Sequence, residues 1–211
     1  AQAYAVPGVE LENGQSISLR ARLETDGIAL EQSGVVQLFV ARRVSDQEAS
    51  QLEPPEGLVP IRLGPDDYHV WLMGDAHSSG KAGYHGEGDS SALLWWGWTD
   101  DSLVLWIEHT DGHFVPCETR ATWIYDGPQV SLSATHGAED FVEFELGLDT
   151  KFEPMAYANE GPHYSPQLKG TRKKSTTHYR ALFSFGELGV DPAVGHTLGA
   201  AAVVNENDGH G

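Results

Sequence analysis

Residues 92–111 read ALLWWGWTDDSLVLWIEHTD, and this stretch decides the fold. Two runs rich in Leu, Val, Ile and Trp flank the polar segment TDDS at residues 99–102. Aromatic and β-branched residues favour strands, whereas clustered Asp and Ser favour turns. The pattern predicts an antiparallel β-hairpin with strands at residues 92–98 and 103–108. In it Trp96 and Trp98 share one face and Trp95 takes the other, and we expect one of these faces to be core.

The rest of the chain shows strand patterns of the same kind. Residues 16–23 alternate apolar and polar side chains with the period of a half-buried strand. Further strands are expected at residues 35–40, 129–133, 141–148, 178–185 and 198–204. Many strands with Gly, Pro and Asp turns, and no long helical period, predict an all-β fold. We expect an antiparallel β-sandwich, immunoglobulin-like or jelly-roll in type, with about eight or more strands and little helix.

Connections between these strands carry their own signals. Asp26-Gly27 is a turn signal, although the stretch between the strands at 16–23 and 35–40 is too long for a tight hairpin. Residues 44–67, rich in Pro and acids, predict a loop or linker, and residues 74–91, rich in Gly and Ser, predict an exposed loop. We therefore divide the chain into a β-rich segment at 1–84, either part of the same sandwich or a small companion domain, and a sandwich core at 85–211.

Composition excludes several function classes. Asp and Glu outnumber Lys and Arg by 31 to 13, giving a net charge of -18, so a phosphate backbone would be repelled and nucleic acid is not expected as a partner. No apolar run approaches the roughly 20 residues that span a bilayer, so membrane insertion is not expected. The single cysteine allows neither an intrachain disulfide nor a thiolate zinc cluster.

The cellular location is inferred from two indirect features. The sequence starts with Ala1-Gln2-Ala3-Tyr4, without an initiator Met or a signal peptide, as in a processed or trimmed chain. The acidic surface suits solubility in an extracellular or salty medium, and calcium sites are the alternative reading of the same charge. We expect a secreted protein, located outside the cell or at its surface.

Three sequence blocks, taken in order, resemble a known family. The first is the hairpin at residues 92–111, the second is WIYDGPQVSL at residues 123–132, and the third runs from Tyr179 through FGELG at residues 185–189 to NENDG at residues 205–209. Together they are similar to the family 9 carbohydrate-binding modules and the related DOMON-like β-sandwich domains. The resemblance covers residues 85–211, whereas residues 1–84 match only in being rich in strands.

The resemblance implies a sugar site. Sugar rings stack their C–H faces on aromatic side chains, and amides or carboxylates hydrogen-bond their hydroxyl groups. The matching blocks place the platform on Trp123 and put Gln129 where the family carries a sugar-binding Glu. Glu145 stands where the family has a sugar-contacting Arg, and the family's second Trp would lie beyond residue 209. The alternative stays open that Trp123 packs at the sandwich rim and that Gln129 faces solvent.

Acidic and amide side chains also form candidate metal sites. Calcium takes hard oxygen ligands from flexible loops, and structural calcium is common in the family that the blocks resemble. The candidate ligands are Asp100, Asp101, Asp111, Asn205, Asn207 and Asp208, although Asp and Asn are also ordinary turn residues. A transition-metal site at His109, Asp111 and His113 is less favoured than solvated loop histidines.

These observations predict a non-catalytic carbohydrate-binding domain, calcium-stabilised, whose partner is a poly- or oligosaccharide. No nucleophile elbow, phosphate loop or haem-attachment motif occurs in the sequence, so no enzyme is expected. One alternative is an extracellular structural or adhesive subunit, of a filament or surface layer, that self-assembles through β-sheet edges. A weaker alternative is a haem-binding DOMON-like domain, for which Met73 and Met155 are the available Met ligands.

Overall fold

The computed structural model of the protein describes residues 16–25, 28–37, 41–63, 88–119, 124–134, 141–159, 164–193, 196 and 198–205. The chain divides into two compact units, residues 1–41 and residues 42–211. The boundary expected after residue 84 lies outside the described residues. Residues 42–63, which we expected in the N-terminal part, belong to the larger unit.

The smaller unit is a hairpin of β1 (Ser16–Thr25) and β2 (Ile28–Gln37). The strands pair from Ser16 opposite Gln37 to Thr25 opposite Ile28. The expectation of a connection too long for a tight hairpin is therefore wrong, because only Asp26 and Gly27 separate the strands. The first half of β2 was missed because its sequence, IALEQSG, does not alternate between apolar and polar residues.

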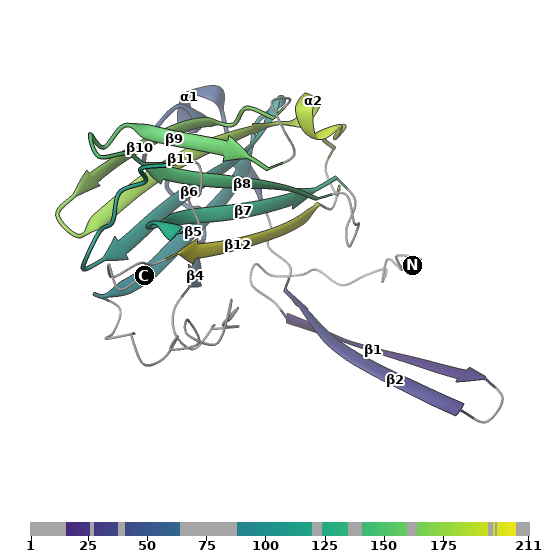
Figure 1. Ribbon diagram of the computed structural model, residues 1–211. Coiled ribbons are helices and arrows are strands. Elements are labelled where there is room, and N and C mark those ends of the chain that lie inside the picture. The colour runs from purple at the N-terminus through teal and green to yellow at the C-terminus, as the bar shows by residue number, and fades with distance from the viewer. Residues whose placement is uncertain are drawn as a thin grey trace. The chain divides into compact units, whose positions relative to one another are not determined.

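The larger unit is a sandwich of two sheets (Figure 1). The six-stranded sheet has the order β10 (Gln167–Lys173), β11 (Thr176–Ser184), β6 (Ser102–Asp111), β5 (Ser90–Trp98), β3 (Arg42–Arg43), and β4 (Ile61–Leu63) also pairs with β5. The four-stranded sheet has the order β12 (Gly199–Asn205), β7 (Gly127–Ser133), β8 (Phe141–Leu148), β9 (Pro154–Ala158). The two helices within the described residues, α1 (Asp46–Ala49) and α2 (Phe185–Leu188), are four residues each. The all-β sandwich with little helix is thus confirmed.

The hairpin of β5 and β6 forms as predicted. Trp98 lies opposite Leu103, and the turn is held by the Thr99 hydroxyl, which accepts hydrogen bonds from the backbone N–H groups of Asp101 (3.3 Å) and Ser102 (3.2 Å). A Thr hydroxyl that satisfies turn amides is a typical local stop for a strand. The strands run slightly past the predicted bounds, so that Ser90 and Ser91, expected in a loop, belong to β5.

The main core lies between the two sheets. Phe183 of β11 packs against Phe144 of β8 with ring centroids 4.7 Å apart, and Leu103 lies opposite Phe183 in the register. Because side chains alternate along a strand, Leu105 and Ile107 share this inner face with Leu103. All three are at most 6% exposed. The inner face of β6 therefore forms the centre of the sandwich core.

A second, smaller core covers the outer face of β6. Val104 and Trp106 are buried there with Val44 and Ala49 of the segment around α1, and Trp95 and Leu58 pack against this cluster. The Trp106 indole N–H donates to the Gln51 carbonyl (3.1 Å), so its polar atom is satisfied. Residues 44–63 are thus not a plain linker: they are short of regular structure but cover one face of the sheet. Trp95 packs on the face opposite Trp96 and Trp98, as the alternation predicted.

Four strands of the sandwich were not predicted: β3, β4, β9 and β10. β10 reads QLKGTRK and β9 reads PMAYA, and neither shows a strong apolar alternation. β3 and β4 are too short, at two and three residues, to give a pattern. All four depend on pairing with a neighbouring strand rather than on local propensity. None of the helices in the described ranges is long and apolar enough to cross a membrane.

Candidate functional site

The outer face of the four-stranded sheet carries a row of polar side chains. Gln129 of β7 lies directly opposite Glu145 of β8, and Glu145 lies opposite Tyr157 of β9. The neighbours Val130 and Phe144 point into the core, so the alternation of the strands turns the row outward. Gln129 and Tyr157 are half-buried, whereas Glu145 is 4% exposed. The structure therefore brings two sequence-predicted site residues together and adds a phenol beside them.

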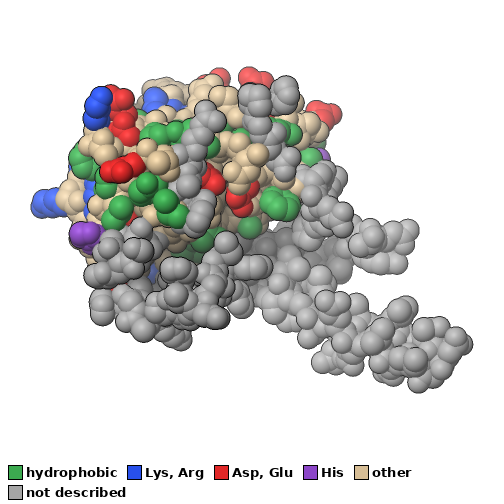
Figure 2. Space-filling view, viewed as in Figure 1, with side chains coloured by type: hydrophobic (Ala, Val, Ile, Leu, Met, Phe, Trp, Pro, Cys, Tyr) green, Lys and Arg blue, Asp and Glu red, His purple; other side chains and the backbone are tan. Residues whose placement is uncertain are grey.

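A second row follows two residues along the same strands. Ser131 lies opposite Glu143, and the Asn159 side-chain amide donates to the Glu143 carboxylate (2.5 Å). The Asn159 backbone N–H also donates to the Glu143 carbonyl (3.0 Å), which extends the sheet past β9. We call the two rows the polar strip: Gln129, Ser131, Glu143, Glu145, Tyr157 and Asn159. Figure 2 shows acidic side chains lying among hydrophobic ones on the face of the molecule viewed as in Figure 1.

The chemistry of the polar strip suits hydroxyl-rich ligands. Amides and hydroxyls both donate and accept hydrogen bonds, and carboxylates accept them. Tyr157 and Asn159 were missed in the sequence because β9 itself was missed. Trp123, the expected platform, lies outside the described residues; three residues separate it in the sequence from the start of β7.

The candidate calcium ligands are spread over the sandwich. Asp100 and Asp101 lie in the β5–β6 turn, and the Asp100 carboxylate pairs with the Arg43 guanidinium (2.5 Å) while its side chain is 75% exposed. Asp111 is the last residue of β6, so the full ten-residue length of that strand separates it from the turn. The structure does not bring these two groups together, and no group of three or more His, Cys, Asp or Glu side chains suited to a metal occurs among the described residues. Asn207 and Asp208 lie outside those residues.

Asp111 instead anchors the chain after β6. Its carboxylate accepts a hydrogen bond from the His113 backbone N–H (2.6 Å) and lies 3.8 Å from an Arg172 guanidinium nitrogen. Arg172 also donates to the Asp111 carbonyl (2.9 Å) and to the Thr177 hydroxyl (2.9 Å). A second buried carboxylate, Asp126, accepts from the Val115 backbone N–H. These carboxylates fix the β6–β7 connection against the end of the sandwich.

Asn205 lies at the same end as Asp126. It ends β12 opposite Gly127, the residue that follows Asp126 in the sequence. Asp111, Asp126 and Arg172 all act on the buried Tyr179 hydroxyl, whose pKa is raised, chiefly by burial. The carboxylates of Asp111 and Asp126 and the amide of Asn205 therefore gather at one end of the sandwich, and Asp100 and Asp101 at the other.

His109 is buried in this end without exposure to solvent. Neither of its ring nitrogens has a hydrogen-bond partner among the described residues. Burial, and secondly the charge of Arg172, lower the pKa of His109 to about 4, because the charged imidazolium is poorly solvated there. His113 by contrast is exposed, so the three residues His109, Asp111 and His113 do not form one accessible cluster. Of the two methionines, Met155 is half-buried in β9 and Met73 lies outside the described residues.

Two solved structures similar to this chain are carbohydrate-binding modules of family 9 from Caldicellulosiruptor kristjanssonii, one in complex with cellotriose and one in complex with glucose. Each is 16% identical to this chain with a TM-score of 0.46, and each match covers 57% of this chain. The matches cover 60% and 61% of the modules, so the chain spans about three fifths of their length. No model of a known protein family and no curated protein matches the sequence.

The buried imidazole predicts how stability depends on pH. The unfolded chain binds a proton at His109 near the ordinary pKa of 6.5, whereas the folded chain does so only near 4. Stability is therefore fully present above pH 6.5 and is lost as the pH falls from 6.5 toward 4, by on the order of 3 kcal/mol. Urea unfolding of the parent chain and of His109→Leu, which cannot titrate, measures this loss as their difference.

An exposed histidine provides the control. The His113→Gln variant should lose stability with pH in parallel with the parent chain, because His113 is exposed in the folded state. Identical pH profiles for the parent chain and His109→Leu would show that His109 is not buried as a neutral group.

Proposed function

We propose that this chain is a non-catalytic, secreted carbohydrate-binding domain that holds a poly- or oligosaccharide on the outer face of its four-stranded sheet. The observation that carries the proposal is the register of Gln129, Glu145 and Tyr157, which sets an amide, a carboxylate and a phenol side by side on three strands. Such a row offers donors and acceptors to adjacent hydroxyl groups.

The spacing of the polar strip supports this reading. Neighbouring strands lie about 5 Å apart, and side chains on one face repeat about every 7 Å along a strand. Backbone pairing therefore fixes the spacing between the polar groups of the strip, so a ligand can bind without rearrangement of the strands. Gln129 and Tyr157 would make the contacts from their half-buried positions, and Glu145, which is 4% exposed, lies between them in the register.

The proposed stacking partner is Trp123. The chain enters β7 immediately after Ile124, Tyr125 and Asp126, so Trp123 is tied in sequence to the strand that carries Gln129. An aromatic ring next to a polar row is the usual composition of a sugar site, since stacking supplies binding energy and hydrogen bonds supply orientation.

Binding is favoured over hydrolysis by the arrangement of the carboxylates. Glu143 and Glu145 are two residues apart on β8 and face the same way. Glycoside hydrolysis uses two carboxyl groups that flank the scissile bond, one on each side of it. Two carboxylates projecting from one strand approach a ligand from the same side, and Glu143 is already paired with Asn159.

We also propose a structural calcium ion at the end of the sandwich that holds Asn205. Asn205 carries an amide oxygen at this end, and Asn207 and Asp208 follow it in the sequence, whereas the Asp111 carboxylate there already accepts from the His113 N–H and lies 3.8 Å from Arg172. Calcium takes about six to eight oxygen ligands, including backbone carbonyls and waters. The turn residues Asp100 and Asp101 are the second candidate location. There a calcium ion would compete with the Arg43 guanidinium for the Asp100 carboxylate.

A second candidate function is self-assembly as an extracellular structural or adhesive subunit of a filament or surface layer. The hairpin of β1 and β2 is a unit by itself, and its two strands pair from Ser16 opposite Gln37 to Thr25 opposite Ile28. A two-stranded hairpin is marginally stable alone, so added strands would stabilise it. In the sandwich, β12 reads GAAAVVN and ends its sheet without any charged residue. Uncharged edge strands readily accept a strand from another copy.

The sugar site predicts a graded response to substitution. In native gels containing soluble polysaccharides, Trp123→Ala should abolish retardation because stacking is lost, and Gln129→Ala should weaken binding by about 1 kcal/mol, the value of one hydrogen bond. Gln167→Ala, on β10 of the other sheet, is the matched control and should bind like the parent chain. A folded Trp123→Ala protein with full affinity would exclude this platform.

The calcium proposal predicts a melting temperature that depends on chelator. An ion that binds only the folded chain stabilises it by mass action, so excess chelator should lower the melting temperature and added calcium should restore it. Differential scanning calorimetry with and without chelator makes the comparison. Unchanged melting would leave the acidic side chains as ordinary turn residues.

The assembly proposal predicts a mass that depends on the β12 edge. Light scattering should show oligomers of the parent chain that dissociate in Ala201→Lys, because a charged side chain on an edge strand opposes strand addition. The equivalent change on β10, Gln167→Lys, should leave the mass unchanged. A parent chain that is monomeric at all concentrations contradicts this second function.

A further inference from the structure

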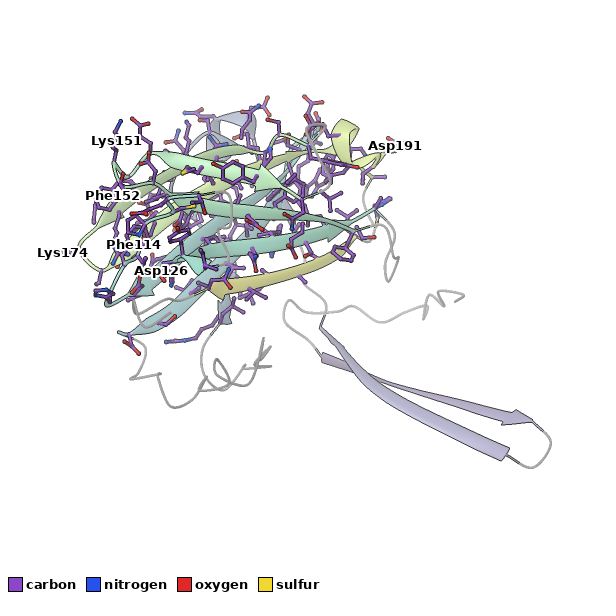
Figure 3. The ribbon with its side chains drawn as sticks, viewed as in Figure 1. Phe114, Asp126, Lys151, Phe152, Lys174 and Asp191 are labelled. Atoms are coloured by element: carbon purple, nitrogen blue, oxygen red, sulfur yellow. The ribbon has the colours of Figure 1, made fainter. Side chains whose placement is uncertain are left out.

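One end of the sandwich holds both non-glycine residues that have positive φ angles in the described ranges. Phe152, in the turn between β8 and β9, has φ 62°, and Lys174, in the turn between β10 and β11, has φ 57°. Figure 3 shows both at one end of the molecule together with Phe114 and Lys151, whereas Asp191 lies at the opposite end. Backbone strain of this kind gathers at functional sites, where the surrounding structure enforces it.

The β8–β9 turn holds Phe152 firmly in this conformation. The Asp149 carboxylate accepts hydrogen bonds from the backbone N–H groups of Lys151 (2.7 Å) and Glu153 (2.8 Å). The Phe152 backbone N–H donates to the Asp149 carbonyl (2.9 Å). Glycine or asparagine ordinarily takes such a left-handed position, because a bulky side chain is strained there. Turn geometry alone therefore does not account for a phenylalanine.

The Phe152 ring stacks on the half-buried Phe114 ring, which in turn lies against the Arg172 guanidinium. It lies over the Phe114 ring with centroids 6.0 Å apart and an angle of 23° between the planes. The Arg172 guanidinium lies 4.5 Å from the Phe114 centroid on a side chain that is 8% exposed. Arg172 is fixed by its bonds to Asp111 and Thr177. The ring is thus positioned before any ligand arrives, which lowers the entropy lost on binding.

The upper part of this stack is open to solvent. Phe152 is 52% exposed, one of the few large apolar residues in the described chain that are so exposed. Burying that ring would have been the favourable arrangement if its purpose were packing. An aromatic ring held out of the core, in a strained turn and on a rigid support, presents a flat face to a ligand.

We propose that Phe152 is a second stacking surface of the carbohydrate site, and that it takes a pyranose ring of a polysaccharide by its C–H face. Lys151 precedes Phe152 in the same turn, and Lys174 lies in the β10–β11 turn at the same end of the sandwich (Figure 3). Ammonium groups donate hydrogen bonds to sugar oxygens. Of the acids in the turn, Asp149 is bound to the turn amides and Glu153 is exposed.

The inference rests on the proposed function and extends it to a chain of several sugars. β8 carries Glu145 and ends at Leu148, one residue before the turn that holds Phe152. At about 3.4 Å per residue, the polar strip and the Phe152 ring are separated by more than 10 Å along the strand. A ligand that uses both must therefore be an oligosaccharide or a polysaccharide rather than a single sugar.

The test is retardation of the full chain in native gels that contain hydroxyethylcellulose, xylan or polygalacturonate. On the polymer that retards the parent chain, Phe152→Ala should weaken binding at least tenfold and Phe152→Tyr should preserve it, because tyrosine keeps the aromatic face. The matched control is Val59→Ala. Val59 is 60% exposed and lies in the segment that covers the outer face of the six-stranded sheet, so its loss should leave retardation unchanged.

A stability measurement separates a binding role from a packing role. Glycine relieves the strain at φ 62°, so Phe152→Gly should bind poorly yet melt no lower than Phe152→Ala. Retardation that persists in Phe152→Ala while Gln129→Ala weakens it overturns the second surface and leaves the proposed function intact. A parent chain that none of the three polymers retards, although Phe152→Gly and Phe152→Ala melt as expected, overturns both.

Discussion

Burial of β6 on both faces is the constraint on which the rest of the structure depends. Residues Leu103 to Ile107 are all at most 6% exposed, although alternate side chains point to opposite sides of the sheet. The inner face needs the second sheet, and the outer face needs the segment around α1. A run of five buried residues therefore forces a three-layer arrangement at this point, with Phe144 and Phe183 on one side and Val44 and Trp106 on the other. The burial of Trp106 is feasible because its indole N–H reaches the Gln51 carbonyl.

The apolar core between the sheets ends before the end of the sandwich that carries Phe152 and Lys174, and this affects the surface there. Where the inner face of β6 becomes polar, at His109 and Asp111, the sheets can no longer close over apolar side chains. Arg172 crosses from β10 to the Asp111 carbonyl and supports Phe114 on its other side. The β8–β9 and β10–β11 turns therefore lie next to a buried, hydrogen-bonded Arg172. The outer face of β7, β8 and β9, by contrast, is ordered by backbone pairing and by the side-chain bond from Asn159 to Glu143.

Sequence patterns predicted the parts of the fold that local chemistry determines. Residues 141–148 were predicted to the residue because FVEFELGL alternates clearly, and the β5–β6 turn was predicted because Thr, Asp and Ser are its natural residues. β9 and β10 were not predicted, because QLKGTRK and PMAYA gain their strand conformation from neighbours. Gln129 and Glu145 were named from the sequence, yet their adjacency depends on a register that only the paired strands define. The Phe152 stack could not be found at all, since its three members are separated by long stretches of chain.

The buried thiol of Cys117 can report local opening of the sandwich, because it reacts only when it becomes exposed. Cys117 is 1% exposed, its Sγ–H donates to the Thr119 carbonyl (2.8 Å), and burial raises its pKa. The thiolate is the form that attacks a thiol reagent, so the folded chain is protected twice, by lack of access and by lack of charge. It is the single cysteine of the sequence, and its backbone N–H donates to Leu148, the last residue of β8. The rate at which a thiol reagent labels Cys117 therefore measures how often the end of β8 separates from the segment that holds Cys117.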